Sequence, residues 1–213
     1  MSSLKKAIVF APHTDDGEIG CGGTIAKLIE KGWQVYYAAF SIARTSAMQN
    51  GLPENILEIE VKAATKVLGI PGENLFIFDY PVRRFPELRQ DILEEMTKLK
   101  RQINPDLVFV PSLNDIHQDH QVVAAEGLRA FKRHSILGYE EPWNNVVFES
   151  RCFIPLEKRH VERKVEALKH YESQKHRSYL TEAAIWGIAE LRGTQLEGGY
   201  AEAFEVLRWI VNL

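Results

Sequence analysis

The stretch IVFAPHTDDGEIGCGG, residues 8–23, decides how the rest of the chain is interpreted. A short apolar run leads directly into one histidine and two adjacent aspartates, and a glycine-rich segment follows. Short apolar runs with such boundaries are typical of buried strands. In open α/β sheets, ligands bind beyond the carboxyl ends of the strands. We therefore predict a strand over residues 6–11 that delivers His13, Asp15 and Asp16 to a functional edge of a sheet.

A second polar cluster, NDIHQDH at residues 114–120, follows the apolar run LVFVP. His13 and Asp16 are three residues apart, as are His117 and His120. Residues at this spacing can face one point from a helical turn, and the clusters converge if their two strands are neighbours. Two histidines and a carboxylate, with water in the open position, are a common ligand set for catalytic zinc. The spacing therefore favours a metal site.

Simpler interpretations remain open for both clusters. Asp15 or Asp16 could be the N-cap of a helix predicted over 20–31. His117 and His120 could lie at a solvated helix start, capped by a neighbouring aspartate. The glycines that follow the first cluster do not have the spacing of a dinucleotide site, and no acidic residue ends the next predicted strand. We expect these glycines to permit a tight turn and close helix packing.

Strand and helix patterns alternate over about the first 135 residues. The predicted strands cover 6–11, 33–40, 75–78 and 107–111, and the predicted helices cover 20–31, 55–68, 88–102 and 121–134. A polar loop is predicted over 41–53. This alternation predicts a Rossmann-like, doubly wound, mostly parallel sheet in an α/β protein.

The last third of the chain has a different pattern. We predict a strand over 146–154, helices over 157–171 and 180–192, and an extended tail over 201–210, which together form a C-terminal α+β elaboration. No linker composition separates this part from the rest. The sequence therefore predicts a single domain spanning residues 1–213.

Composition and charge restrict the class of protein. The net charge of −3 gives no basic footprint for nucleic acid. Two cysteines, Cys21 and Cys152, provide no disulfide framework and suit a reducing compartment. The apolar runs are too short for a signal peptide or a membrane span. We expect a cytoplasmic protein without nucleic-acid partners or membrane insertion.

Both clusters resemble the motifs of a known family. Pro12-His13-Thr14-Asp15-Asp16, with Glu18 following, resembles the PH-x-DD-x-E signature of the PIG-L/LmbE-like zinc-dependent de-N-acetylases. The stretch HQDH at 117–120 matches the H-x-D-H motif of that family, and the segment 164–174 resembles its late K..AL..Y.SQ pattern. Thr14 stands where proline is common in the family, a change that removes no ligand. Glu18 would support the site or hold the turn.

The resemblance implies a cofactor and a reaction. His13, Asp16 and His120 would bind Zn²⁺, although the same donors accept Fe²⁺, cobalt or nickel. A zinc-bound hydroxide would attack the acetamide of an amino-sugar conjugate, releasing acetate and a free amine. Because family members often assemble into multimers, the resemblance also implies a homo-oligomer.

The resemblance also assigns catalytic roles. Asp15 would act as general base and then as general acid. A protonated His117 would share the charge of the tetrahedral oxyanion with the zinc, and Asp119 would orient or charge this histidine. Electrostatic stabilisation of this kind is usually the largest contribution to catalysis.

Substrate specificity does not carry over from the family. Leu57 occupies the place where many members have an arginine that is thought to contact the substrate. Arg44, Arg83 and Arg84 follow predicted strands at the same end of the sheet, and arginine forks onto phosphate or carboxylate groups. Individually each could be a solvated surface charge. Together they predict a phosphorylated, lipid-linked or nucleotide-linked N-acetyl amino sugar.

Two other functions remain as alternatives. Trp143, in a predicted loop over 139–145, could stack on a sugar ring. The first alternative function is a metal-dependent amidase acting on a non-sugar amide, for which the same metal site would serve. A non-catalytic binding module could also retain the fold. Such a module would not need Asp15, so the intact clusters favour an enzyme.

Overall fold

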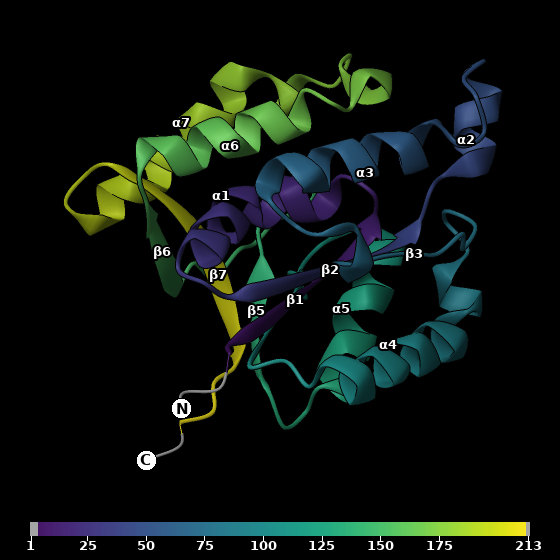
Figure 1. Ribbon diagram of the computed structural model, residues 1–213, viewed down its shortest axis with the longest axis horizontal. Coiled ribbons are helices and arrows are strands. Elements are labelled where there is room, and N and C mark those ends of the chain that lie inside the picture. The colour runs from purple at the N-terminus through teal and green to yellow at the C-terminus, as the bar shows by residue number, and fades with distance from the viewer. Residues whose placement is uncertain (1–3, 212–213) are drawn as a thin grey trace.

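The computed structural model describes residues 4–211 and has one seven-stranded sheet at its centre, in the order β3-β2-β1-β4-β5-β7-β6 (Figure 1). The strands are β1 (Lys6–His13), β2 (Gln34–Ser41), β3 (Leu75–Ile77), β4 (Leu107–Pro111), β5 (Ser135–Tyr139), β6 (Cys152–Leu156) and β7 (Tyr200–Arg208). The five strands from β3 to β5 are parallel, whereas β7 runs antiparallel to both β5 and β6. The predicted mostly parallel, doubly wound α/β fold is confirmed.

Helices cover both faces of this sheet. They are α1 (Asp16–Glu30), α2 (Arg44–Gln49), α3 (Ile56–Leu68), α4 (Arg89–Ile103), α5 (Gln118–Ala130), α6 (Lys158–Leu168) and α7 (Glu182–Gly193). Figure 1 shows α1, α3, α6 and α7 on one side of the sheet and α4 with α5 on the other. The C-terminal helices α6 and α7 therefore form part of the layer that contains α1.

The central strand β1 has an apolar side chain at every position from Ala7 to Ala11. Ala7, Val9 and Ala11 pack into the core on the α1 side, whereas Ile8 and Phe10 pack into the core on the α5 side. Successive strand residues point to opposite faces, so a strand covered on both faces needs apolar residues throughout.

The junction between β1 and α1 is tighter than predicted. The strand continues to His13 and the helix begins at Asp16, whereas the pattern predicted a strand over 6–11 and a helix over 20–31. The glycines lie inside the helix rather than in a turn before it. A Cβ atom added to Gly20 would collide with the ring of Tyr139, so the glycine permits close helix–strand packing.

Other segments also differ from the prediction. The loop predicted over 41–53 contains α2, the helix predicted over 121–134 begins earlier and ends at Ala130, and β5 was not predicted. No glycine or proline separates the end of that helix from β5, so the helix was predicted to continue to residue 134 and no element was assigned to the strand that follows. The strand predicted over 146–154 is restricted to β6, and the predicted tail over 201–210 is the paired strand β7.

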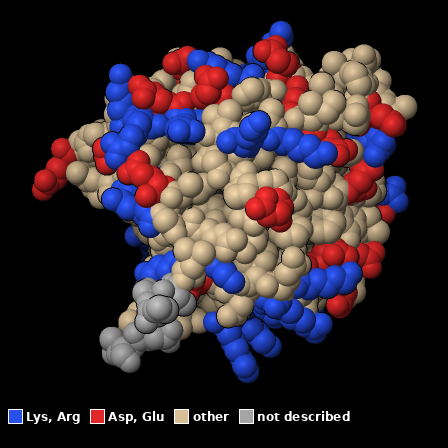
Figure 2. Space-filling view, in the orientation of Figure 1, with Lys and Arg blue, Asp and Glu red and all other residues tan. Residues whose placement is uncertain are grey.

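The surface and the helices carry two further observations. No helix within residues 4–211 is both long enough and apolar enough to cross a bilayer. Figure 2 shows lysine and arginine beside aspartate and glutamate mainly around the periphery of one face, whose centre is formed mostly by other residues.

Candidate metal centre and active site

Three donor atoms meet at the carboxyl edge of the sheet. Strands β1 and β4 are parallel neighbours, which meets the condition for the two polar clusters to converge. The Nδ1 atom of His13 lies 3.1 Å from Oδ2 of Asp16. The Nε2 atom of His120 lies 3.3 Å from each of these two atoms. The donors therefore form a nearly equilateral triangle.

This triangle has the size that a metal ion requires. For metal–ligand bonds of about 2.0–2.1 Å in tetrahedral geometry, neighbouring donor atoms lie roughly 3.3 Å apart. Two imidazoles and one carboxylate also match the donor set of catalytic zinc sites that keep a position for water. The residues present therefore fit a divalent metal ion.

Two buried carboxylates orient the two histidines of the triangle. Asp119 lies 3.1 Å from Nε2 of His13, and Asp115 lies 2.8 Å from Nδ1 of His120. Each carboxylate accepts a hydrogen bond from the N–H of the outer ring nitrogen, which leaves the inner nitrogen free to bind a metal. Asp119 thus orients His13 rather than the side chain of His117, to which the resemblance assigned it.

The capping interpretation of the first cluster is confirmed for the position of Asp15 but not for its side chain. Asp15 occupies the N-cap position of α1 but makes no capping bond with its side chain. Oδ2 of Asp16 accepts a hydrogen bond from the backbone N–H of His13 at 2.7 Å. Both carboxylates therefore remain available to the site.

His117 itself is the N-cap of α5. Its Nδ1 atom accepts a hydrogen bond from the backbone N–H of Asp119 at 3.2 Å. A neutral His117 then carries its proton on Nε2. Burial, and then the charges of His13 and His120, lower the pKa of His117 to about 4. The structure therefore favours a neutral hydrogen-bond donor over the protonated His117 that the resemblance implied.

In the donor triangle, the negative charge of Asp16 and the positive charges of the two histidines stabilise one another. Burial alone would lower the pKa of His13, but the charge of Asp16 and the hydrogen bond to Asp119 outweigh burial and raise this pKa to about 9. Burial alone would raise the pKa of Asp16, but His120 and His13 hold it well below its usual range. The three groups therefore bind protons or a metal ion in competition.

Asp15 has the acidity expected of a proton carrier. Burial, and then the neighbouring charge of Asp16, raise the pKa of Asp15 to about 6. A general base works best when its pKa is near the operating pH. The side chain also lines the cavity beside the donor triangle.

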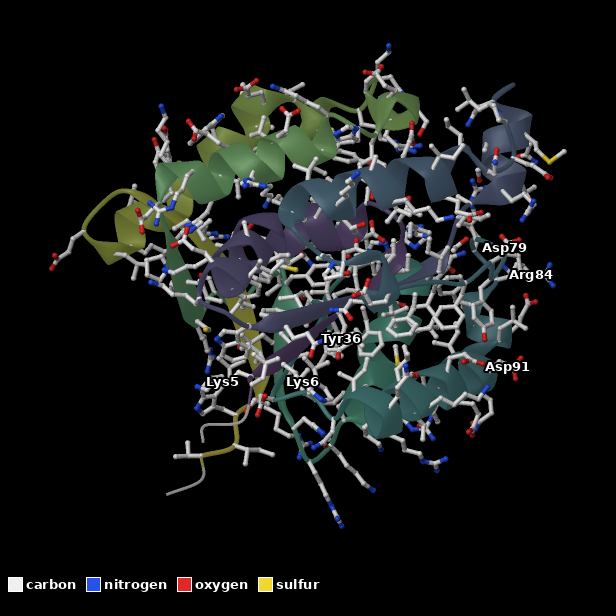
Figure 3. The ribbon with its side chains drawn as sticks, in the orientation of Figure 1. Lys5, Lys6, Tyr36, Asp79, Arg84 and Asp91 are labelled. Atoms are coloured by element: carbon white, nitrogen blue, oxygen red, sulfur yellow. The ribbon has the colours of Figure 1, made fainter. Side chains whose placement is uncertain are left out.

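A cavity of about 280 Å³ opens over the triangle. Arg83 and Trp143 line it, as predicted for substrate contacts, but Arg44 and Arg84 do not. Arg44 is paired with Asp79 at 2.8 Å and with Glu54. Arg84 is paired with Glu87, and Figure 3 shows it at the outer edge of the molecule.

Several residues that line the cavity were not predicted to belong to the site. Glu141, Gln174, His176, Arg177 and Tyr179 all line the cavity. Glu141 follows the unpredicted strand β5, is 1% exposed, and lies 3.6 Å from Nδ1 of His120. Gln174 ends the late K..AL..Y.SQ pattern, to which no role at the site was assigned, and His176, Arg177 and Tyr179 lie in the turns before α7, where no motif marks them.

A buried carboxyl group holds the loop between the ligands. Both Tyr37 and Tyr171 place their hydroxyl groups against Glu18 and against the backbone oxygen of Thr14. Burial raises the pKa of Glu18 to about 8. Thr14 lies between His13 and Asp15, so this network fixes the backbone that carries the first cluster.

The fold and site define an α/β protein with a candidate metal centre at the carboxyl edge of its sheet. The sequence profile of the PIG-L family, described as GlcNAc-PI de-N-acetylase, matches residues 8–131. This match spans more than half of the chain and includes both polar clusters. The chain belongs to the PIG-L family.

Individual relatives agree with this assignment. The uncharacterized deacetylase YaiS of Escherichia coli (strain K12) is 28% identical over 174 residues, covering 79% of this chain and 91% of the relative. The diacetylchitobiose deacetylase of Thermococcus kodakarensis is 26% identical over 156 residues, covering 66% of this chain and 57% of the relative.

Solved structures share the fold. The conserved protein TT1542 from Thermus thermophilus matches with a TM-score of 0.79 and 24% identity, over 99% of this chain and 97% of that one. GalB, the 4-carboxy-2-hydroxymuconate hydratase from Pseudomonas putida, matches with a TM-score of 0.78 and 20% identity, over 99% and 100% of the chains. The fold alone therefore does not determine the reaction.

Proposed function

We propose that this protein is a divalent-metal-dependent, zinc-preferring deacetylase that removes the N-acetyl group from an amino-sugar conjugate. The observation that carries the proposal is the donor triangle of His13, Asp16 and His120, with Asp15 beside it in the same cavity. Membership of the PIG-L family and the named deacetylases among the relatives support the choice of substrate.

Each residue has a task in amide hydrolysis. A divalent ion held by the triangle would polarise the acetamide carbonyl and lower the pKa of water. Asp15 accepts the proton of the attacking water and returns it to the amine nitrogen as the C–N bond breaks. His117 donates from Nε2 to the carbonyl oxygen as negative charge develops there.

The supporting groups act through the triangle. Asp115 and Asp119 bind the outer ring nitrogens of the two imidazoles, so the inner nitrogens would be available to hold the ion. Glu18, Tyr37 and Tyr171 fix the backbone between the ligands. A preorganised site of this kind needs little rearrangement during the reaction.

The test is acetate release from N-acetylglucosamine and its conjugates by protein of measured metal content. We expect release by the zinc-loaded protein and none by the Asp15→Asn variant, which should still bind one equivalent of zinc. Release that Asp15→Asn leaves unchanged would contradict the proposal. Zinc binding without hydrolysis of any acetamido sugar would move the assignment to another reaction of this fold.

A further inference from the structure

The arginines near the carboxyl edge of the sheet fall into two groups. Arg44, Arg84 and Arg89 each pair with a carboxylate, and none of them lines the cavity. Arg83 and Arg177 line the cavity, and within residues 4–211 neither has a carboxylate oxygen within 4.0 Å. The cations that face the substrate space are therefore those without a charged partner in the described part of the protein.

Arg177 is held in place by neutral neighbours. Its Nε atom donates to Oε1 of Gln174 at 3.1 Å, and its guanidinium lies 5.9 Å from the centre of the Tyr179 ring. The Tyr179 ring stacks on Trp143 with 3.7 Å between centres and 10° between planes. This layered wall orients the guanidinium without neutralising its charge.

Arg83 is fixed through its backbone. Its N–H donates to Oδ2 of Asp119 at 2.6 Å, and its carbonyl oxygen accepts a hydrogen bond from Gln118 at 3.3 Å. These contacts hold the backbone of Arg83, an exposed residue, at the edge of the cavity that it lines. His176 adds another nitrogen donor to the cavity lining.

We propose that Arg177 and Arg83 form an anion subsite that selects acetamido sugars carrying their own carboxylate or phosphate group. The inference rests on the proposed function, because the acetamide must lie at the donor triangle. A volume of about 280 Å³ is at the lower end of small-molecule sites, which favours one sugar ring with its charged group attached directly. Carboxylate and phosphate share the geometry that arginine binds with two hydrogen bonds.

The first arm of the test measures binding without turnover. Metal-free protein is titrated calorimetrically with N-acetylglucosamine, its 1-phosphate, its 6-phosphate and N-acetylmuramic acid. We expect at least one anionic sugar to bind more tightly than the neutral sugar, on the order of 10- to 100-fold. Arg177→Gln and Arg83→Gln should remove this preference, whereas Arg177→Lys should restore part of it.

Arg84→Gln is the matched control, because Arg84 neighbours Arg83 in sequence but pairs with Glu87 outside the cavity. It should keep the preference for the anionic sugar. Equal binding of all four sugars, or equal losses in Arg84→Gln and Arg177→Gln, would overturn the subsite. The choice among the four probes distinguishes carboxylate from phosphate and locates the charged group on the ring.

The second arm uses the zinc-loaded enzyme. We expect Arg177→Gln to raise KM for the preferred anionic sugar on the order of 10- to 100-fold more than it raises KM for the neutral sugar, whereas Arg84→Gln should leave both KM values unchanged. An equal fall in kcat for neutral and anionic sugars would show that Arg177 acts through Asp15, against the inference. Loss of anion binding in Arg177→Gln without any acetate release would preserve the subsite and reject the deacetylase. Acetate release with equal kcat/KM for neutral and anionic sugars would support the deacetylase and reject the anion subsite.

Discussion

The two parts of this chain contribute differently to one cavity. Residues 6–130 supply the donor triangle, Asp15 and His117, and these lie within the region that matches the family profile. Residues 152–208 supply the wall that contains Arg177 and Tyr179, beyond the matched region. The candidate metal centre therefore comes from short motifs in the first part, whereas the cavity wall is assembled by packing of both parts, with Arg83 from the first and Arg177 from the second.

The parts are nevertheless joined by buried polar contacts. Glu202 of β7 accepts hydrogen bonds from the backbone N–H groups of Gly23 and Thr24 in α1, and it pairs with Lys164 of α6 at 2.7 Å. Helix α1 has non-helical angles at Cys21, so the helix restarts there and exposes new N–H groups. A carboxylate from the C-terminal part satisfies them.

The largest expected effect tests whether metal binding belongs to the first part alone. His120→Ala should abolish stoichiometric zinc binding and lower kcat/KM at least about a thousandfold, because it removes one of three donors. The matched control is His176→Ala, which removes a cavity imidazole of the second part and should keep the metal. Metal content and acetate release are measured for both variants. Loss of zinc from His176→Ala would contradict the assignment of metal binding to the first part alone.

The next effect concerns the proton carrier. Asp15→Asn should lower kcat on the order of 10²- to 10⁴-fold. In the wild type, the carboxylate must be deprotonated to act as base, so kcat/KM should fall as the pH drops through about 6. A bound cation lowers this pKa further, which places the midpoint at or below that value. A pH profile without an acidic limb between about pH 4 and 7 would contradict the role of Asp15.

A smaller effect sharpens the role of the two orienting carboxylates. Asp115→Asn and Asp119→Asn should each weaken zinc affinity about 10- to 100-fold, because each removes the acceptor that orients one imidazole. Asp119 also accepts hydrogen bonds from the backbone N–H groups of Arg83 and Phe85. Asp119→Asn should therefore also change KM for the anionic substrate, whereas Asp115→Asn should not. Equal KM values for the anionic substrate in the two variants would contradict this difference.

The smallest effect compares equivalent contacts from the two parts. Tyr37 of β2 and Tyr171 after α6 contact the same two groups, Glu18 and the backbone oxygen of Thr14. Replacing either tyrosine by phenylalanine should cost about 1–3 kcal/mol in the free energy of unfolding, since buried acceptors lose a donor. Denaturant titrations give these values. A loss confined to Tyr37→Phe would show that the second part does not brace the motif.

Several features of the site followed from local pattern. The mostly parallel sheet and a polar cluster after each of two strands were predicted, because strand ends and three-residue spacings are local properties of the sequence. The resemblance to a family implied the ligand set His13, Asp16 and His120, and the structure showed that β1 and β4 are neighbours. The boundaries of α1 and β5 were missed, because glycine propensity and the absence of turn residues conflict with what packing imposes.

The sequence by itself therefore determined the α/β fold and the residue types that can bind a metal and move a proton. Only the tertiary structure decided that Asp119 orients His13, that Arg44 and Arg84 are paired outside the cavity, and that Arg83 and Arg177 line it. The physical reason is that motifs fix chemistry through neighbouring residues, whereas pairing and cavity lining depend on contacts between segments far apart in the chain.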